Sequence, residues 1–211
     1  MIQRVYEGAK KSKEIDTLVV ATDDERIFNE VIKFGGQVMM TEIDHPNGTS
    51  RCNEVLSCYP DFDVVINIQG DEPLVNFEQL DLLIEAFKDD TIKIATLGIK
   101  TNEIDDFNNP NRIKIVTDYQ NNALYFSRSK IPYERNSIDK FSFLRHIGLY
   151  AFRADVLSEI SSFPQTDLEE IESLEQLRWL YFGKKIRVVQ THIETPNIDT
   201  PEDLEKVLNH L

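Results

Sequence analysis

The chain has 211 residues, of which 41% are hydrophobic and 28% are charged, and its formal net charge is -14. This length suits a single domain with a full hydrophobic core. A surface this acidic repels nucleic acid and anionic lipid, so we expect neither as a partner. No apolar run approaches the roughly 18 residues of a membrane span, and the N-terminus lacks the apolar core of a signal peptide. These features favour a cytoplasmic protein.

The cysteines are too few for a disulfide framework, and the histidines are too scattered for a zinc site. The two cysteines are Cys52 and Cys58, and the four histidines lie far apart in the sequence. We therefore expect reduced thiols rather than a disulfide framework. No cluster has the spacing of zinc ligands.

Apolar residues recur at helical spacing near the N-terminus, where Ile2, Val5 and Ala9 share one face. Buried strands and amphipathic helices then alternate along the chain. The expected helices cover residues 2–13, 25–34, 77–88, 168–183 and 199–211, and another helix starts within 50–58. The expected strands cover residues 16–24, 37–41, 63–69, 93–100, 143–153 and 184–194.

This alternation predicts an α/β fold in which a mostly parallel open sheet carries helices on both faces. Residues 111–132 differ, because two strand-like runs are joined by the turn sequence DYQNN. They predict an antiparallel hairpin that extends the sheet. Repeats and linkers are absent from the sequence, so residues 1–211 are expected to form one domain.

Two pairs of acids follow expected strands: Asp23 with Asp24, and Asp71 with Glu72. Ligands of open α/β sheets bind at the carboxyl ends of the strands, where these pairs lie. Each pair could be a helix cap or a solvated turn. Together they could instead form a Mg²⁺ site, because Mg²⁺ takes one or two carboxylates plus substrate phosphates. Neither of the two common glycine-rich phosphate loops occurs in the sequence.

The later strands carry cations interleaved with aromatic residues. The cations are Arg112, Lys114, Arg128, Lys130 and Arg145. This pattern fits either a solvated sheet face or a site for a saccharide or carboxylate.

Three more polar residues are ambiguous from the pattern alone. His146 has the pattern of an ordinary strand histidine with a hydrogen-bond partner. Glu175 and Gln176 lie inside an expected helix, where the pattern favours a solvent-facing turn.

Six motifs together resemble the 3-deoxy-manno-octulosonate (Kdo) cytidylyltransferases, also called CMP-Kdo synthetases, across essentially the whole chain. The motifs are DHPNGTSR at 44–51, QGDEP at 69–73, ALYFSRSKIPYER at 123–135, FLRHIGLYAFR at 143–153, IESLEQLRWLYFGKKI at 171–186 and DTPEDLEKV at 199–207. QGDEP alone is typical of sugar nucleotidyltransferases in general. RHIGLY, LEQLRWL and DTPEDL make the resemblance specific to the Kdo enzymes.

The resemblance implies a nucleotide-diphospho-sugar transferase-like fold and an enzyme that transfers CMP from CTP to Kdo. It implies Mg²⁺ as cofactor, pyrophosphate as second product, and a role in lipopolysaccharide assembly. The implied CTP-binding residues are Gly48, Thr49, Arg51 and Gln69. The implied Kdo-binding residues are Arg128, His146, Tyr150, Glu175 and Gln176. Asp71 and Asp199 are implied as metal ligands and as the catalytic acids.

The chain departs from the family pattern at its start. In the family a first strand and an arginine-rich phosphate-binding loop precede the helix that begins here at Met1. We therefore expect a domain that is N-terminally incomplete relative to the family. Because the first strand of such sheets lies in the middle, we expect a gap in the sheet. The resemblance also implies a homodimer, and the aromatic-rich segments ALYF and FLRHIGLYAF suggest apolar surface for its interface.

Two alternatives remain open. The chain could act on another acidic sugar, such as an amino-Kdo or a sialic acid. It could also be a non-catalytic fragment that binds a sugar or a partner, which the missing phosphate loop favours.

Overall fold

The computed structural model describes residues 1–136 and 141–194. Its helices are α1 (Ile2–Ala9), α2 (Glu25–Lys33), α3 (Gly48–Ser57), α4 (Phe77–Ala86), α5 (Ile104–Asn108), α6 (Ala154–Ser161), α7 (Asp167–Glu172) and α8 (Gln176–Tyr181). Its strands are β1 (Val20–Thr22), β2 (Val38–Met40), β3 (Val64–Asn67), β4 (Ile94–Thr101), β5 (Lys114–Thr117), β6 (Ala123–Ser127), β7 (Phe143–Arg153) and β8 (Ile186–Thr191). The expected helix over 199–211 lies outside the described residues.

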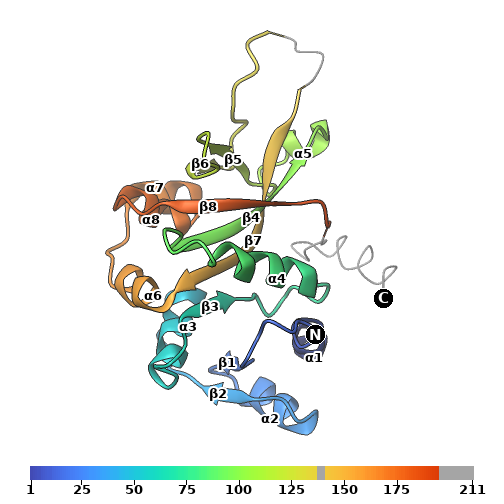
Figure 1. Cartoon of the computed structure of the whole chain (residues 1–211), viewed down its shortest axis with the longest axis vertical. Helices are drawn as coiled ribbons and strands as arrows, with labels where there is room; N and C mark the ends of the chain where they lie inside the picture. Colours follow the sequence, from blue (N-terminus) through green and yellow to red (C-terminus); the bar gives the residue numbers. More distant parts are fainter. Residues whose placement is uncertain (137–140, 195–211) are drawn as a thin grey trace.

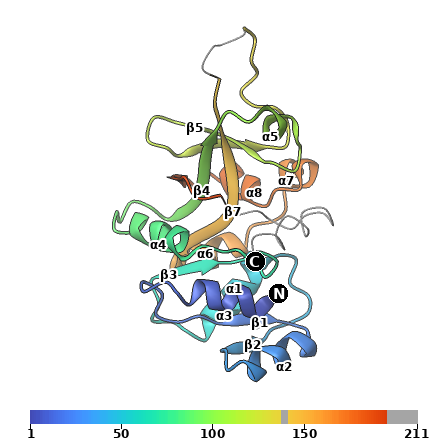
Figure 2. The ribbon, with the colours of Figure 1, turned by 90° about the vertical axis from the view of Figure 1, so that its right-hand side faces the viewer.

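Eight strands form two sheets within the described residues. The larger sheet has six strands in the order β6-β5-β7-β4-β8, and β3 pairs with the far part of β7. β1 and β2 form a separate parallel pair. The hairpin of β5 and β6 lies at the opposite end of the molecule from β1 and β2 (Figure 1; Figure 2).

The α/β class and the open sheet are confirmed, but the sheet is mixed rather than mostly parallel. β4 and β8 are parallel, whereas β7 runs antiparallel to β3, β4 and β5. The reason lies in the connections. A parallel neighbour needs a crossover of a dozen or more residues, usually a helix. Between β4 and β7 the chain instead makes the short helix α5 and a hairpin, and β7 returns between β3 and β4.

The predicted hairpin is confirmed. β5 and β6 pair antiparallel, with Ile115 opposite Phe126. The turn is held by the Asp118 carboxylate, which accepts hydrogen bonds from the backbone N–H groups of Gln120 and Asn122 at 2.8 Å each. Asn121 adopts a φ of 61°, a left-handed conformation that asparagine tolerates better than most residues.

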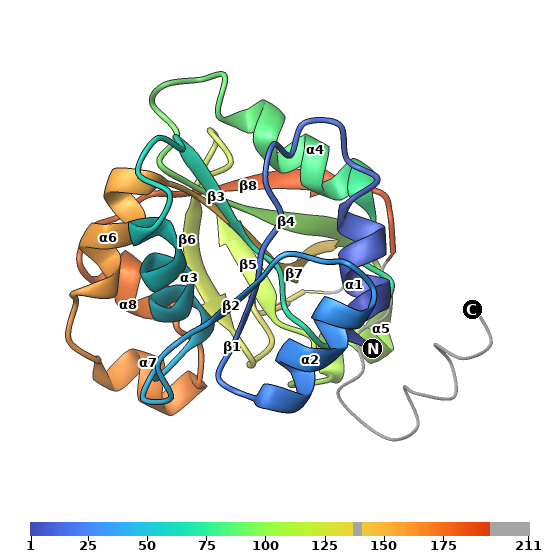
Figure 3. The same cartoon turned by 90° about the horizontal axis from the view of Figure 1, so that it is seen from below.

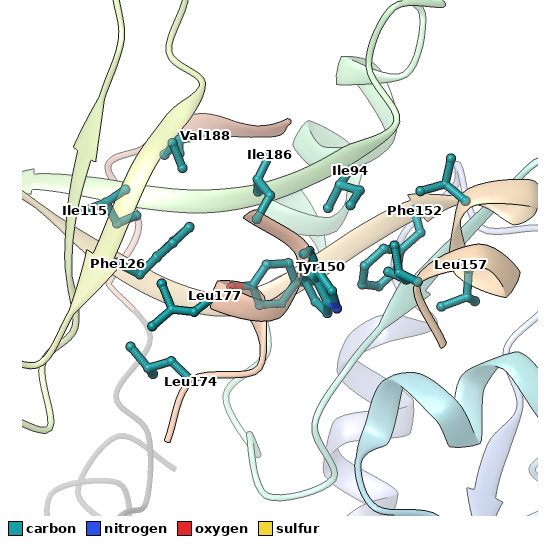
Figure 4. Close-up of a cluster of buried hydrophobic side chains, with 14 of the residues drawn as sticks. Ile94, Ile115, Phe126, Tyr150, Phe152, Leu157, Leu174, Leu177, Ile186 and Val188 are labelled. Carbon is teal, nitrogen blue, oxygen red and sulfur yellow. The ribbon is translucent and has the colours of Figure 1, made fainter. Parts of the chain in front are cut away.

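Helices cover both faces of the large sheet, as predicted (Figure 3). On one face α1 and α4 pack through Val5, Leu80 and Leu83 onto apolar residues of β4 and β7. On the other face α3, α6 and α8 form a second core cluster. Its members include Leu56 and Trp179. They also include Leu157, Leu177, Phe152 and Phe126, which are labelled in Figure 4. The chain therefore has a continuous core on each side of β4 and β7.

The expected single helix over 168–183 is wrong, because the structure breaks it into α7 and α8. Ser173 has a φ of 50° and ends α7 in the left-handed conformation. A buried ion pair joins the two short helices, with the Arg178 Nε donating to Glu169 Oε2 at 2.6 Å. The break turns Glu175 and Gln176 away from a continuous helical face and toward the sheet.

A gap separates the two sheets. Among the described strands β1 pairs only with β2, and the residues of β3 pair only with β7. A cavity of about 450 Å³ lies between them, lined mainly by apolar residues of both edges. They include Leu18, Val19 and Ala21 on one side, Val64, Val65, Ile66 and Ile68 on the other, and Cys52, Val55, Leu56 and Ile84 from α3 and α4. This matches the predicted interruption of the sheet.

No helix within the described ranges is both long and apolar enough to cross a membrane.

Candidate active site

A second cavity, of about 300 Å³, opens at the end of β3. It is lined by Thr49, Asn67, Gln69, Asp71, Glu72, His146, Gly148, Tyr150, Leu174, Glu175, Gln176 and Trp179. These residues come from the start of α3, the end of β3 and the loop after it, the middle of β7, and α8 with the connection that precedes it. Segments far apart in the sequence therefore meet at one site.

Most of the predicted site residues line this cavity. They are Thr49, Gln69, Asp71, His146, Tyr150, Glu175 and Gln176. Asn67 and Glu72 are buried, whereas Gln69 and Asp71 are exposed. The cavity thus has a closed inner part and a polar open edge.

The first turn of α3 is held close to β3. Asn47 caps the helix, and its side-chain oxygen accepts a hydrogen bond from the backbone N–H of Ser50 at 2.9 Å. Gly48 follows, and a Cβ at this position would lie 3.1 Å from the side-chain nitrogen of Asn67. Glycine therefore allows the helix start to approach the carboxyl end of β3.

Thr49 connects α3 to the α7–α8 region. Its hydroxyl donates to Glu175 Oε2 at 3.0 Å. Burial raises the pKa of Glu175 to about 7, although the hydrogen bond from Thr49 opposes this rise. Near neutral pH the Glu175 carboxyl therefore exists in both protonation states, and it can donate or accept a hydrogen bond in the cavity.

His146 has a hydrogen-bond partner, as expected for an ordinary strand histidine, and its Kdo-binding role stays a prediction. Its Nε2 lies 3.0 Å from the Thr96 hydroxyl, and its ring packs against Phe126 and Tyr150. It also lines the cavity. Burial lowers the pKa of His146 to about 3, so the ring is neutral at physiological pH.

Tyr150 and Gln176 contribute polar groups from the inner wall. Tyr150 stands edge-on to Trp179 at 5.1 Å between ring centroids, and burial raises the pKa of its hydroxyl well above the usual value. It is therefore a neutral hydroxyl. The side-chain nitrogens of Gln176 and Trp179 have no hydrogen-bond partner among the described residues. A buried N–H without a partner is costly, so these two donors favour an oxygen-rich ligand or water.

Arg51 and Arg128 lie outside the lining of the cavity. Arg51 donates to Asp23 Oδ2 at 3.2 Å and to the Thr41 hydroxyl. The Arg128 guanidinium donates to the backbone oxygens of Glu172, Pro110 and Ser173. Their ligand-binding roles stay predictions. Asp199 lies outside the described residues.

The four acids do not form one metal site. Asp24 caps α2 by accepting from the backbone N–H of Arg26 at 2.7 Å, and its hydrogen bond with the Arg26 side chain lowers its pKa to about 2. Only Asp71 and Glu72 line the cavity. Within the described ranges, no group of three or more His, Cys, Asp or Glu side chains is placed to hold a metal.

The predicted cationic cluster is largely structural. Lys114 is fully buried and donates to the backbone oxygens of Asn109, Arg112 and Arg128. Arg145 is buried against Asp106 and Glu194. Neither a solvated sheet face nor a ligand site describes these two cations, because both are enclosed and already paired.

Sequence reasoning missed Asn67, Gly148, Leu174 and Trp179. For Asn67 a signal existed, because it is a polar residue inside the expected apolar strand 63–69 and lies two residues before Gln69, so an extended chain would point both side chains to one side. Leu174 and Trp179 are typical apolar positions of a helical pattern, and nothing in that pattern separates a cavity wall from ordinary core.

The family of cytidylyltransferases matches residues 1–186 of the chain. A solved structure described as CMP:2-keto-3-deoxy-manno-octonic acid synthetase complexed with CTP superimposes with a TM-score of 0.92 at 40% identity. The match covers 100% of this chain and 88% of that structure. A 4-diphosphocytidyl-2C-methyl-D-erythritol synthase from Anaerococcus prevotii, at 18% identity and a TM-score of 0.63, shares the fold. The chain belongs to the cytidylyltransferase family.

Curated relatives show to which group of cytidylyltransferases the chain belongs. A 3-deoxy-manno-octulosonate cytidylyltransferase of Fusobacterium nucleatum is 50% identical over 212 residues, covering 100% of this chain and 86% of the relative. Its namesake in Parabacteroides distasonis is 50% identical over 221 residues, covering 100% of this chain and 87% of the relative. Within the cytidylyltransferases, the chain is therefore a member of the 3-deoxy-manno-octulosonate cytidylyltransferases, which confirms the family predicted from the sequence.

Proposed function

We propose that the chain transfers CMP from CTP to the anomeric hydroxyl of Kdo, giving CMP-Kdo and pyrophosphate for lipopolysaccharide biosynthesis in the cytoplasm. The observation that carries the proposal is the 300 Å³ cavity, which brings seven predicted ligand-binding residues together from four separate segments. The similarity to relatives named for this reaction supports the same substrates.

In this proposal the two substrates bind at different walls of the cavity, and Arg51 and Arg128 contact them from outside its lining. Gly48, Thr49, Arg51 and Gln69 bind the cytidine side of CTP. His146, Tyr150, Glu175 and Gln176, together with Arg128, bind the acidic sugar. The raised pKa of Glu175 supports this assignment, because a carboxyl that can hold its proton near pH 7 does not repel the carboxylate of the sugar.

The reaction requires no nucleophile from the protein. The anomeric oxygen of Kdo attacks the α-phosphorus of CTP and loses its proton, while the bond from the α-phosphorus to the leaving pyrophosphate breaks. Such transfers are catalysed mainly by positioning and by charge neutralisation. The neutral ring of His146 and the hydroxyl of Tyr150 are suited to orient the sugar, since Tyr150 is buried and both rings pack against aromatic neighbours.

Mg²⁺ fits the residues at the open edge of the cavity. Asp71 offers an exposed carboxylate there, and Mg²⁺ needs few protein ligands when substrate phosphates supply the rest. We propose Asp71 and Asp199 as its ligands, and the bound ion would neutralise phosphate charge and lower the pKa of the sugar hydroxyl.

The experiment that tests the sugar assignment is product analysis by mass spectrometry. The chain is incubated with CTP and Mg²⁺ and, separately, with Kdo, an amino-Kdo or a sialic acid. The proposal expects CMP-Kdo as the main product. A main product from either other sugar would favour the related transferase, and binding of Kdo without any product would favour a non-catalytic protein.

A homodimer is proposed on family grounds, and of the two aromatic-rich segments suggested as its interface only part is exposed. Phe126, Ile147 and Phe152 of the aromatic-rich strands are buried in the core of the chain itself. The exposed apolar side chains nearby are Tyr119 and Leu124 of the hairpin. Sedimentation of the wild type and of Leu124→Glu tests the hairpin as the interface, and a wild type that stays monomeric at all concentrations would contradict the dimer.

A further inference from the structure

We infer that His45 is a positioning residue, which fixes the start of α3 and thereby holds Gly48 and Thr49 where they bind the nucleotide. The inference rests on the proposed function, which assigns these two residues to CTP. His45 itself lies outside the cavity, in the loop between β2 and α3. Its effect must therefore pass through the helix.

The His45 ring contacts two successive turns of α3. Its Nδ1 lies 3.1 Å from the Ser50 hydroxyl, and its Nε2 is hydrogen bonded to the Glu54 carboxylate. Ser50 and Glu54 are four residues apart and so lie on one face of the helix. The ring thus clamps the loop against the outer side of the first two turns.

The neighbouring hydrogen bonds define the direction of both contacts. The Ser50 hydroxyl donates its single hydrogen to the backbone oxygen of Asn47 at 3.0 Å. Toward His45 it therefore offers a lone pair, and Nδ1 must donate. The hydrogen bond with His45 is the largest cause that lowers the pKa of Glu54, so an ionised carboxylate accepts at Nε2.

The same loop has other attachments that do not involve His45. The backbone N–H of Glu42 donates to Glu54 Oε2 at 3.0 Å, and Arg51 reaches Thr41 and Asp23. Removal of the His45 ring therefore leaves the loop attached at its start. The part set free is the segment directly before the Asn47 cap.

A shift of the Asn47 cap would directly move the next two residues, Gly48 and Thr49. Thr49 is almost fully buried, lines the cavity and donates to Glu175. Gly48 sits within close contact of Asn67. Neither residue can move without changing the wall assigned to the nucleotide. The sugar-binding residues of β7 are on another element and are not attached to His45.

The test compares three variants of His45 with a matched control. His45→Asn keeps a donor near Nδ1 for Ser50, His45→Gln keeps a donor near Nε2 for Glu54, and His45→Ala keeps neither. His192→Ala is the control, because His192 is exposed and outside the cavity. We expect His45→Ala to raise the KM for CTP about tenfold, equivalent to about 1.4 kcal/mol. The Asn and Gln variants should fall between Ala and wild type. Because Thr49 also donates to Glu175 of the sugar-binding wall, the KM for Kdo should rise as well, but by less than the KM for CTP, with kcat changed less than about twofold.

Hydrogen exchange of the backbone provides a readout that does not need turnover. Amides of residues 48–50 should exchange faster in His45→Ala than in wild type or His192→Ala. Unchanged exchange and an unchanged KM for CTP would overturn the inference. Equal losses in kcat and in both KM values, with a lower melting temperature, would also overturn it, since they indicate a general structural role. A wild type that makes no CMP-Kdo would refute the proposed function, while the exchange data would still decide the role of His45.

Discussion

Glu175 is the residue whose protonation most affects the cavity. Its pKa is raised to about 7 by burial, so the folded state holds the proton more tightly than the unfolded state. The free energy of unfolding therefore falls as pH rises from about 4.5 to above 7, by up to about 3 kcal/mol.

Glu175→Gln should remove this pH dependence, because the amide does not ionise. Denaturant unfolding at pH 5 and pH 8 measures the effect. We expect the variant to gain stability relative to wild type at pH 8 and not at pH 5. Parallel stability profiles for the two proteins would show that the Glu175 carboxyl is not desolvated in the native state.

Substitution of Asp71 tests whether this residue is a ligand of Mg²⁺. Asp71→Asn removes one anionic ligand from a site with few, so we expect it to abolish most turnover at limiting Mg²⁺ while the melting temperature stays unchanged. Asp24→Asn is the matched control, because asparagine also caps helices and Asp24 caps α2 away from the cavity. Wild-type turnover by Asp71→Asn at limiting Mg²⁺ would refute Asp71 as a ligand.

Single residues of the site also show which positions a sequence pattern can predict and which it cannot. Pattern alone singled out Asp71 and Glu72, which line the cavity at the end of β3, but the same rule also singled out Asp23 and Asp24, which do not. It failed for Glu175 and Gln176, which it assigned to solvent. Only the family resemblance predicted their place. The physical reason is Ser173, whose left-handed conformation breaks the helix and cannot be read from helical spacing.

At the scale of elements, the α7–α8 pair depends on the buried ion pair of Glu169 and Arg178. Arg178 also donates to the backbone oxygen of Phe163 at 3.1 Å. Removing one partner of a buried pair leaves an uncompensated charge, which costs about 3–5 kcal/mol. Because Gln176 begins α8, the sugar wall of the cavity should be disturbed as well.

We therefore expect Arg178→Leu to destabilise the chain by about 3–5 kcal/mol and to raise the KM for Kdo more than that for CTP. Lys33→Ala is the control, since it breaks an exposed pair with Glu30 and should cost less than about 0.5 kcal/mol. Denaturant unfolding measures the loss of stability in Arg178→Leu and in Lys33→Ala. The double change Glu169→Leu with Arg178→Met should recover much of the stability. Equal small losses in Arg178→Leu and Lys33→Ala would contradict the assigned role of the pair.

Element type was largely predictable, whereas strand direction was not. The hairpin at 111–132 was recognised because Asp118 and Asn121 provide turn chemistry. The antiparallel course of β7 was missed, since a buried strand has the same apolar pattern in either direction. Direction is decided by the connection before β7, and the short helix α5 was itself not predicted.

At the scale of the whole molecule, the cavity between β1 and β3 is the main structural weakness. Both facing edges carry backbone groups without a strand partner among the described residues. Each such group costs roughly 1–3 kcal/mol when buried, against a total stability of about 5–15 kcal/mol.

We expect an N-terminal extension carrying the first strand and phosphate loop of the family to raise the melting temperature of the chain by several degrees, since about 1 kcal/mol corresponds to 2–4 °C at this size. An extension of equal length made of glycine and serine is the control. Thermal unfolding of the three proteins is the measurement. Equal melting temperatures of the three proteins would mean that the added strand does not occupy the cavity between β1 and β3.

We propose that this chain transfers CMP from CTP to Kdo at the cavity formed by α3, β3, β7 and α8. The most direct test is the initial rate of pyrophosphate release with CTP and Mg²⁺, measured with and without Kdo. We predict release that depends on Kdo, saturates with Kdo concentration, and is lost in Asp71→Asn. Release that is equal with and without Kdo, or no release from either this chain or its N-terminally extended form, would contradict it.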